Sequence, residues 1–131
     1  MAQTWTFKCF LNASGRDLID EWYSAQDGKV RAAFDAVLEI LASLPKMDWR
    51  RPEWAPLSGD TCKDLSEVRV KQHRRQLRLV GYFGTEEYEY IFLVGFQKQR
   101  DSDTNKACIL ANARKGEVIH DCRRTTVCSF P

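Results

Sequence analysis

Residues 67–96, EVRVKQHRRQLRLVGYFGTEEYEYIFLVGF, decide the fold of this chain. The segment is rich in β-branched and aromatic residues and is broken by two short polar or glycine-containing turns, which predicts three consecutive strands of a sheet. The expected strands are Leu65–Gln72, Gln76–Phe83 and Tyr88–Phe96. The third is apolar on both faces, as a central strand is.

Basic side chains are concentrated on these strands. Between Arg69 and Gly84 the chain has five Lys or Arg, one His and no Asp or Glu, although the formal net charge of the whole protein is only +2. These residues are Arg69, Lys71, His73, Arg74, Arg75 and Arg78. A local basic patch on strands is an electrostatic footprint for a phosphate-bearing partner. The alternative is a solvated face or a sheet edge protected against aggregation.

The residues before this segment predict one strand and two helices. Thr4–Leu11 is rich in aromatics and partly alternates, which favours a strand. We expect a short helix at Arg16–Ala25 and a longer one at Lys29–Leu44, where apolar residues recur every three or four positions. The two helices form an expected hairpin that packs on the sheet, and residues 46–64 are expected to be a long loop.

The residues after this segment predict a helix from about Thr104 to Lys115. The chain is therefore expected to be one α+β domain, residues 1–118, followed by a polar, flexible tail at 119–131. The expected sheet is mostly antiparallel with about four strands. No apolar run approaches the ~20 residues needed to span a bilayer, and no secretory signal is visible, so the cytoplasm is the expected compartment.

The five cysteines are expected to be reduced thiols. Their number is odd and they are scattered along the chain, whereas a disulfide framework favours an even number in a secreted protein. The spacing of His120, Cys122 and Cys128 fits no standard zinc pattern. We therefore expect no metal and no cofactor.

The order of elements and a set of short motifs resemble the RelE/ParE superfamily of bacterial toxins, and more closely its phage-derived HigB-like branch. The motifs are Leu57-Ser58-Gly59, Leu65-Ser66-Glu67-Val68-Arg69, Arg78 with Tyr82-Phe83, Gly95-Phe96-Gln97-Lys98, and Ala111 with Arg114 in the last helix. They span roughly Thr4 to Val118. Gln99 stands where the second Lys of the usual pair is found, and the proline common before the last helix is absent.

The resemblance implies the toxin of a type II toxin–antitoxin system. Members of the family are usually ribosome-dependent mRNA endonucleases, so the implied partners are mRNA, the ribosome and a small antitoxin, which in the HigB-like branch is a helix-turn-helix, HigA-like protein. The neighbouring ParE branch poisons DNA gyrase instead. The alternative is therefore a non-catalytic protein of the same fold, either gyrase-directed or an inactive phage or mobile-element protein.

RNA cleavage without a metal requires the ribose 2′-OH to attack the adjacent phosphorus, and fixed cations must stabilise the added negative charge. Arg69 and Arg78 are the expected cations, because a guanidinium binds two phosphate oxygens at once, and Lys98 can join them. For proton transfer His73 is preferred over Lys71, because a histidine titrates near neutrality. Tyr82 is a further candidate.

A second set of residues is expected to bind the RNA chain without taking part in the chemistry. It consists of Arg74, Arg75, Arg100, Trp49 and Trp54. The two tryptophans could stack on exposed bases, but aromatic residues in a loop more often cover a core. Glu67 is expected to pair with a neighbouring arginine rather than act as a base.

Overall fold

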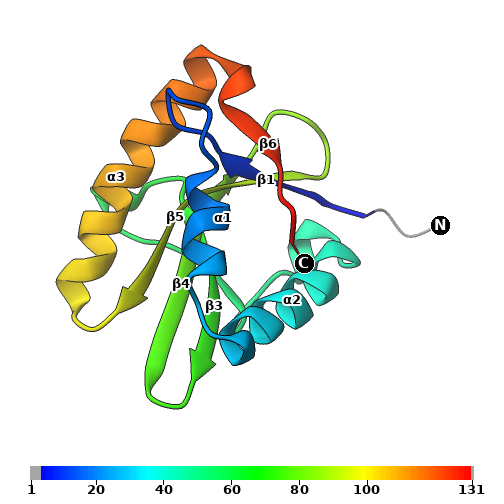
Figure 1. Cartoon of the computed structure of the whole chain (residues 1–131), viewed down its shortest axis with the longest axis vertical. Coiled ribbons are helices and arrows are strands. Elements are labelled where there is room, and N and C mark those ends of the chain that lie inside the picture. Colours follow the sequence, from blue (N-terminus) through cyan, green and yellow to red (C-terminus); the bar gives the residue numbers. More distant parts are fainter. Residues whose placement is uncertain (1–3, 131) are drawn as a thin grey trace.

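Six strands form one mixed sheet in the computed structural model, which describes residues 4–130 (Figure 1). The strands are β1 (Thr6–Phe10), β2 (Trp54–Pro56), β3 (Ser66–Gln72), β4 (Arg75–Phe83), β5 (Glu89–Lys98) and β6 (Thr125–Val127). Their order across the sheet is β2-β3-β4-β5-β1-β6. β1 runs parallel to β5, and the other neighbouring pairs are antiparallel.

The expected α+β class is confirmed, and the β3–β4–β5 meander has nearly the expected strand bounds. The expected number of about four strands is wrong, since the described residues contain two more. β2 lies in the expected loop and β6 in the expected tail. Each has only three residues, which is too short for a periodic pattern to be recognised. β2 pairs with β3 and β6 pairs with β1, and periodicity does not indicate which strands pair.

Three α-helices in the described residues cover the two faces of the sheet. α1 (Leu18–Ser24) and α2 (Gly28–Ala42) form the expected hairpin on one face, and α3 (Asp101–His120) packs against the other, as Figure 1 shows. α3 is longer at both ends than the expected helix. None of these helices is long and apolar enough to cross a membrane.

The core lies between the sheet and the α1–α2 hairpin. Val68, Val70, Leu77 and Leu79 all project to that face and are buried. An aromatic cluster continues the core toward β1, and it includes Trp5, Phe7, Phe34, Trp49, Phe83, Tyr90 and Phe92. Because one face is filled in this way, the alternate side chains of β3 and β4 must project to the opposite face.

The expected flexible tail is instead part of the fold as far as Phe130. β6 pairs with β1, and the Phe130 ring stacks on Tyr23 with ring centroids 4.0 Å apart. Phe130 is only 5% exposed, and Ser129 Oγ is 2.7 Å from a carboxylate oxygen of Asp20. The sequence pattern is polar here because β6 lies at the edge of the sheet, where only one side of the strand is paired.

The expectation of reduced cysteines is wrong for four of the five. Cys9 forms a disulfide with Cys128, and Cys62 forms one with Cys108. Cys122 is exposed and unbonded. The first disulfide fastens β1 to the segment after β6, and the second fastens the loop before β3 to α3. The described residues contain no group of three or more His, Cys, Asp or Glu that could hold a metal ion.

Candidate nucleic-acid interface

A buried carboxylate joins the two arginines that the sequence singles out. Arg69 and Arg78 are directly opposite each other on β3 and β4, so their side chains share the face that the α1–α2 hairpin leaves free. Glu67 Oε1 accepts a hydrogen bond from Arg69 Nε at 2.9 Å and another from Arg78 Nη1 at 2.6 Å. Glu67 is 0% exposed, and the expectation that it pairs with an arginine is confirmed.

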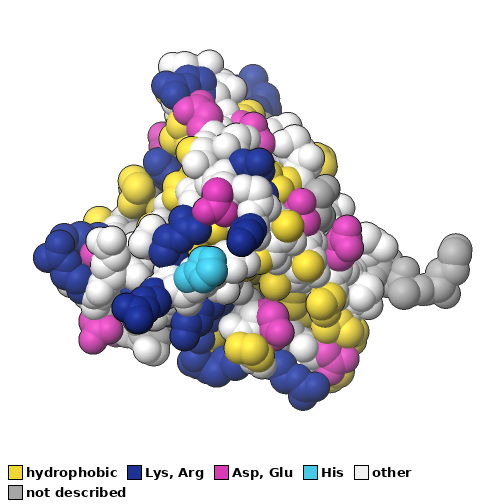
Figure 2. Space-filling view, turned by 60° about the horizontal axis from the view of Figure 1, so that its bottom comes forward, with side chains coloured by type: hydrophobic (Ala, Val, Ile, Leu, Met, Phe, Trp, Pro, Cys, Tyr) yellow, Lys and Arg dark blue, Asp and Glu magenta, His cyan; other side chains and the backbone are white. Residues whose placement is uncertain are grey.

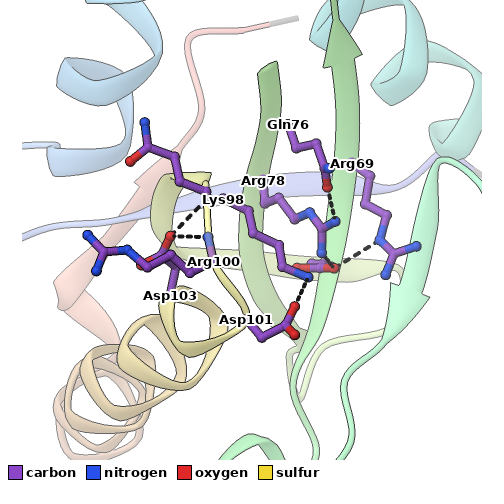
Figure 3. A network of polar contacts seen from close by, with 9 residues as sticks. Arg69, Gln76, Arg78, Lys98, Arg100, Asp101 and Asp103 are labelled. Atoms are coloured by element: carbon purple, nitrogen blue, oxygen red, sulfur yellow. Dashed lines mark hydrogen bonds and ion pairs between the residues drawn. The ribbon is translucent and has the colours of Figure 1, made fainter. Parts of the chain in front are cut away.

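The two arginines are not equivalent. Arg78 is buried, and its Nη2 donates to Gln76 Oε1 at 2.7 Å, so both of its terminal nitrogens are engaged. The side chain of Arg69 is 25% exposed and uses only Nε on Glu67. Within residues 4–130 its two terminal nitrogens have no hydrogen-bond partner, and in Figure 3 they point away from the ion pair. Arg69 is therefore the arginine with donors left for a ligand.

A cavity of ≈ 400 Å³ lies beside this arginine pair. Its polar lining comes from Glu53, Arg69, Lys71, Gln76 and Arg78, and its apolar lining from Ala33, Val37, Pro52 and Val70. The cavity lies beside the start of β2: Arg69 N–H donates to the O of Glu53, the residue before β2, and β3 continues beyond that point as an edge strand. Charged side chains beside an apolar wall suit a ligand that is part phosphate and part nucleobase.

The β3–β4 hairpin carries further cations beyond this cavity. His73 and Arg74 form its turn, both are exposed, and His73 has a positive φ of 56°. Figure 2 shows Lys and Arg side chains gathered over the end of the molecule that carries this hairpin. His73 lies four residues from Arg69, about 13 Å along a strand at ~3.3 Å per residue, whereas Lys71 is half as far and lines the cavity.

Lys98 extends from β5 on the same side of the sheet as the arginine pair. It is opposite Gln76 on β4, and Figure 3 shows it beside Arg78. Its Nζ is 3.5 Å from a carboxylate oxygen of the exposed Asp101. Asp103 fixes the start of α3 close by, because it accepts hydrogen bonds from the backbone N–H groups of Gln99 and Arg100. These bonds lower the pKa of the Asp103 carboxyl.

The other expected RNA-binding residues do not form one surface with the cavity. Arg74 is exposed at the hairpin turn and Arg100 is exposed at the start of α3, but neither lines the cavity. Arg75 Nη2 contacts Asp27 Oδ2 at 2.5 Å, which ties the hairpin to the cap of α2. The hydrogen bonds that the Asp27 carboxylate accepts from the Val30 backbone N–H and from Arg75 lower its pKa.

Trp49 and Trp54 belong to the aromatic core, so their expected role in base stacking is not what the structure shows. Trp49 is 3% exposed, and its Nε1 donates to Leu41 O at 2.9 Å. Trp54 is half-buried and packs edge-on against the Trp49 ring with centroids 6.2 Å apart. The expected loop therefore shields the core instead of presenting aromatic faces to a ligand.

Tyr82, a further candidate for proton transfer, is not part of this site. It lines a second cavity of ≈ 840 Å³ at the other end of the α3 face, beside the Lys8–Glu89 ion pair. Burial and the nearby Glu89 charge raise the pKa of Tyr82. The Lys115 ammonium lies 4.9 Å from the centre of its ring.

Sequence reasoning did not find Gln76 or the cavity wall. Gln76 orients Arg78, and its position opposite Lys71 is a matter of hairpin register that the turn alone decides. Ala33, Val37 and Pro52 come from α2 and from the segment before β2, and no periodic signal relates them to β3. Only the alternation of Glu67, Arg69 and Lys71 indicated which face carries the site.

Comparison with known protein families finds a match that covers most of this chain. Residues 21–115 match the family model described as phage-derived protein Gp49-like (DUF891). A search of curated proteins finds no match. The matched region begins in α1 and ends in α3, so it includes β3, β4, β5 and every residue of the arginine site. This chain belongs to the phage-derived Gp49-like family, a family of RelE/ParE-like toxins.

Proposed function

We propose that this protein is the toxin of a type II toxin–antitoxin system, of the HigB-like branch, and that it cleaves mRNA on the ribosome. Membership of a RelE/ParE-like toxin family supports the first part. The second part rests on the cavity beside Arg69. Glu67 holds the Nε of Arg69, and the two terminal nitrogens have no hydrogen-bond partner among residues 4–130. A guanidinium in that state is ready to bind two oxygens of a phosphodiester.

In the proposed reaction the ribose 2′-OH loses its proton and attacks the adjacent phosphorus. The 2′-O–P bond forms, the P–O5′ bond breaks, and the leaving 5′-oxygen takes a proton from water, so that the products are a 2′,3′-cyclic phosphate and a 5′-hydroxyl. The terminal nitrogens of Arg69 stabilise the negative charge that develops on the phosphate oxygens. Lys98 adds positive charge from β5, and the buried Arg78 keeps Glu67 in place. We assign acceptance of the 2′-OH proton to Lys71 in preference to His73, because Lys71 lines the cavity and His73 lies in the hairpin turn.

The antitoxin is proposed to be a small helix-turn-helix, HigA-like protein. In this proposal the antitoxin acts by covering the basic face or by holding the toxin away from the ribosome. A small DNA-binding protein encoded beside this chain should abolish its growth arrest on co-expression. A neighbour that binds the toxin without relieving the arrest would contradict this assignment.

Arg69→Ala is expected to reduce mRNA cleavage by about 10²–10³-fold, which is the usual cost of removing one group that stabilises developing charge. The measurement is primer extension on a translated reporter mRNA after induced expression in a bacterial host. The matched control is Arg123→Ala, which also removes one arginine charge, from an exposed pair with Asp121. New 5′ ends inside the coding region should appear with the intact protein and the control, and only during translation.

Two outcomes would contradict the proposal in different ways. Growth arrest without new 5′ ends would favour the gyrase-directed alternative, in which the arginines bind another partner. If a protein that circular dichroism shows to be folded causes neither growth arrest nor cleavage, it is an inactive member of the family. The presence of Gln99 in place of the second Lys would then be consistent with the loss of activity.

Lys71→Ala is expected to lower the single-turnover cleavage rate by about 10²–10⁴-fold, the range for loss of an acid or base catalyst. His73→Ala is expected to have the smaller effect, since His73 lies in the turn and outside the cavity lining. The measurement is cleavage of mRNA on programmed ribosomes with purified variants, beside their affinity for the ribosome. If His73→Ala lowered the cleavage rate more than Lys71→Ala did, with unchanged affinity for the ribosome, the catalytic role would belong to His73.

A further inference from the structure

The geometry of the ion pair points to an additional role at this site. We infer that Glu67 is its positioning residue: the buried carboxylate holds the Nε edge of Arg69 and thereby turns the two terminal nitrogens of Arg69 toward the cavity. Glu67 itself does not line the cavity and is 0% exposed, so it cannot touch a substrate. The expected effect of Glu67 on the cleavage rate rests on the proposed function.

The argument begins with the chemistry of the guanidinium. An arginine side chain on a strand has several rotatable bonds, and a free one loses conformational entropy when it binds. A carboxylate that accepts from Nε leaves both terminal nitrogens available and fixes the plane of the fork. In Figure 3 the contact to Arg69 is made through Nε alone, which is the geometry that preserves a bidentate site for phosphate.

The carboxylate is itself held by a second arginine. Arg78 binds the same oxygen of Glu67 at 2.6 Å, and Gln76 fixes the other terminal nitrogen of Arg78 at 2.7 Å. Glu67 Oε2 is buried and accepts no hydrogen bond from the described residues. Both arginine contacts therefore fall on one oxygen, and the contacts Gln76–Arg78–Glu67–Arg69 form a chain whose two ends, Gln76 and Arg69, line the cavity while Glu67 is buried between them.

The first test examines the environment of the Arg69 side chain by NMR and does not depend on an assay of RNA cleavage. The Arg69 Nε–H resonance, identified by its loss in Arg69→Ala, should be resolved and protected from solvent exchange in the NMR spectrum of the intact protein. In Glu67→Gln, which keeps the shape but removes the charge, it should broaden and move to the position of exposed arginines. An unchanged resonance would overturn the inference.

The second test is a double-mutant cycle on cleavage. Glu67→Gln alone is expected to reduce the cleavage rate by about 100-fold, as a misplaced catalytic group does. In the Arg69→Ala background it should cause no further loss, because it acts only through Arg69. Equal losses in both backgrounds would show a purely structural role. If the intact protein cleaves nothing, the proposed function fails, and the NMR result still decides whether Glu67 positions Arg69.

A second variant keeps the inference testable if Glu67→Gln does not fold. Glu67→Leu/Arg78→Met replaces both buried charges by apolar groups, a change that folded proteins often tolerate. Arg69 then keeps its charge but loses its anchor. The Arg69 Nε–H resonance should again show solvent exchange, whereas in Arg78→Met alone it should stay protected. A protected signal in the double variant would contradict the positioning role.

Discussion

Replacing Cys9 and Cys128 by serine is expected to lower the free energy of unfolding by about 4–5 kcal/mol, because the disulfide closes a very long loop in the unfolded chain. The two cysteines are separated by 119 residues. The disulfide also keeps β6 on β1 and brings Phe130 to the Tyr23 ring. The measurement is urea unfolding of the double variant and the intact protein under non-reducing conditions.

The matched control for this prediction is Cys122→Ser, which changes an exposed and unbonded cysteine. It should leave the stability within about 0.5 kcal/mol, as most surface substitutions do. A reducing agent should lower the stability of the intact protein and have less effect on the double variant. Equal unfolding midpoints for the intact protein and the double variant under oxidising conditions would contradict the expectation.

Arg78→Ala is expected to lower the free energy of unfolding by about 3–5 kcal/mol, the usual cost of removing one partner from a buried ion pair. Glu67 would then remain fully buried with only Arg69 to neutralise it, and Gln76 would lose its contact as well. Thermal and urea unfolding of the purified variant measure the loss.

Arg69→Ala is the control, because it removes the same charge from the same carboxylate while leaving the buried partner in place. Its expected cost is about 1.5–3 kcal/mol, the range for a hydrogen bond to a charged group. A larger loss for Arg69→Ala than for Arg78→Ala would show that the exposed arginine is the structural one. If Arg78→Ala destabilises the protein more than Arg69→Ala does, a loss of toxicity in Arg78 variants can come from unfolding as well as from lost catalysis. Arg69→Ala is then the better variant for testing function.

The parts of the fold with strong local signals could be predicted from the sequence. The apolar stripe from Val30 to Leu41 gave α2, and the alternation around Val68 gave the meander and its two faces. The parallel pairing of β1 with β5 and the strands β2 and β6 could not be predicted, because strand pairing between distant segments leaves no periodic trace. The disulfides were missed for the same reason, since only the folded chain brings Cys9 to Cys128.

The sequence allowed the basic residues of the candidate site to be predicted, but not how they are arranged in space. Alternation predicted the face that carries Arg69. The position of Arg78 directly opposite depends on the two-residue turn between β3 and β4, whereas the expected strand bounds left three residues there. The sequence cannot show that one arginine is buried and the other open, since that depends on how α3 and the segment before β2 cover the sheet. Trp49 shows the same limit: an aromatic residue in an irregular segment more often covers a core than binds a ligand, but only the structure shows that this side chain is buried.

The place of β1 between β5 and β6 has a consequence for synthesis of the chain. About 80 residues separate Phe10 from Glu89, and at roughly 5–20 residues per second a ribosome needs about 4–16 s to make them. Throughout that interval neither neighbour of β1 has been made, so both edges of β1 are unpaired. The β3–β4 hairpin with its arginines closes locally before β1 acquires either neighbour. In the nascent protein Arg69 and Arg78 therefore come to lie opposite each other before the sheet is complete.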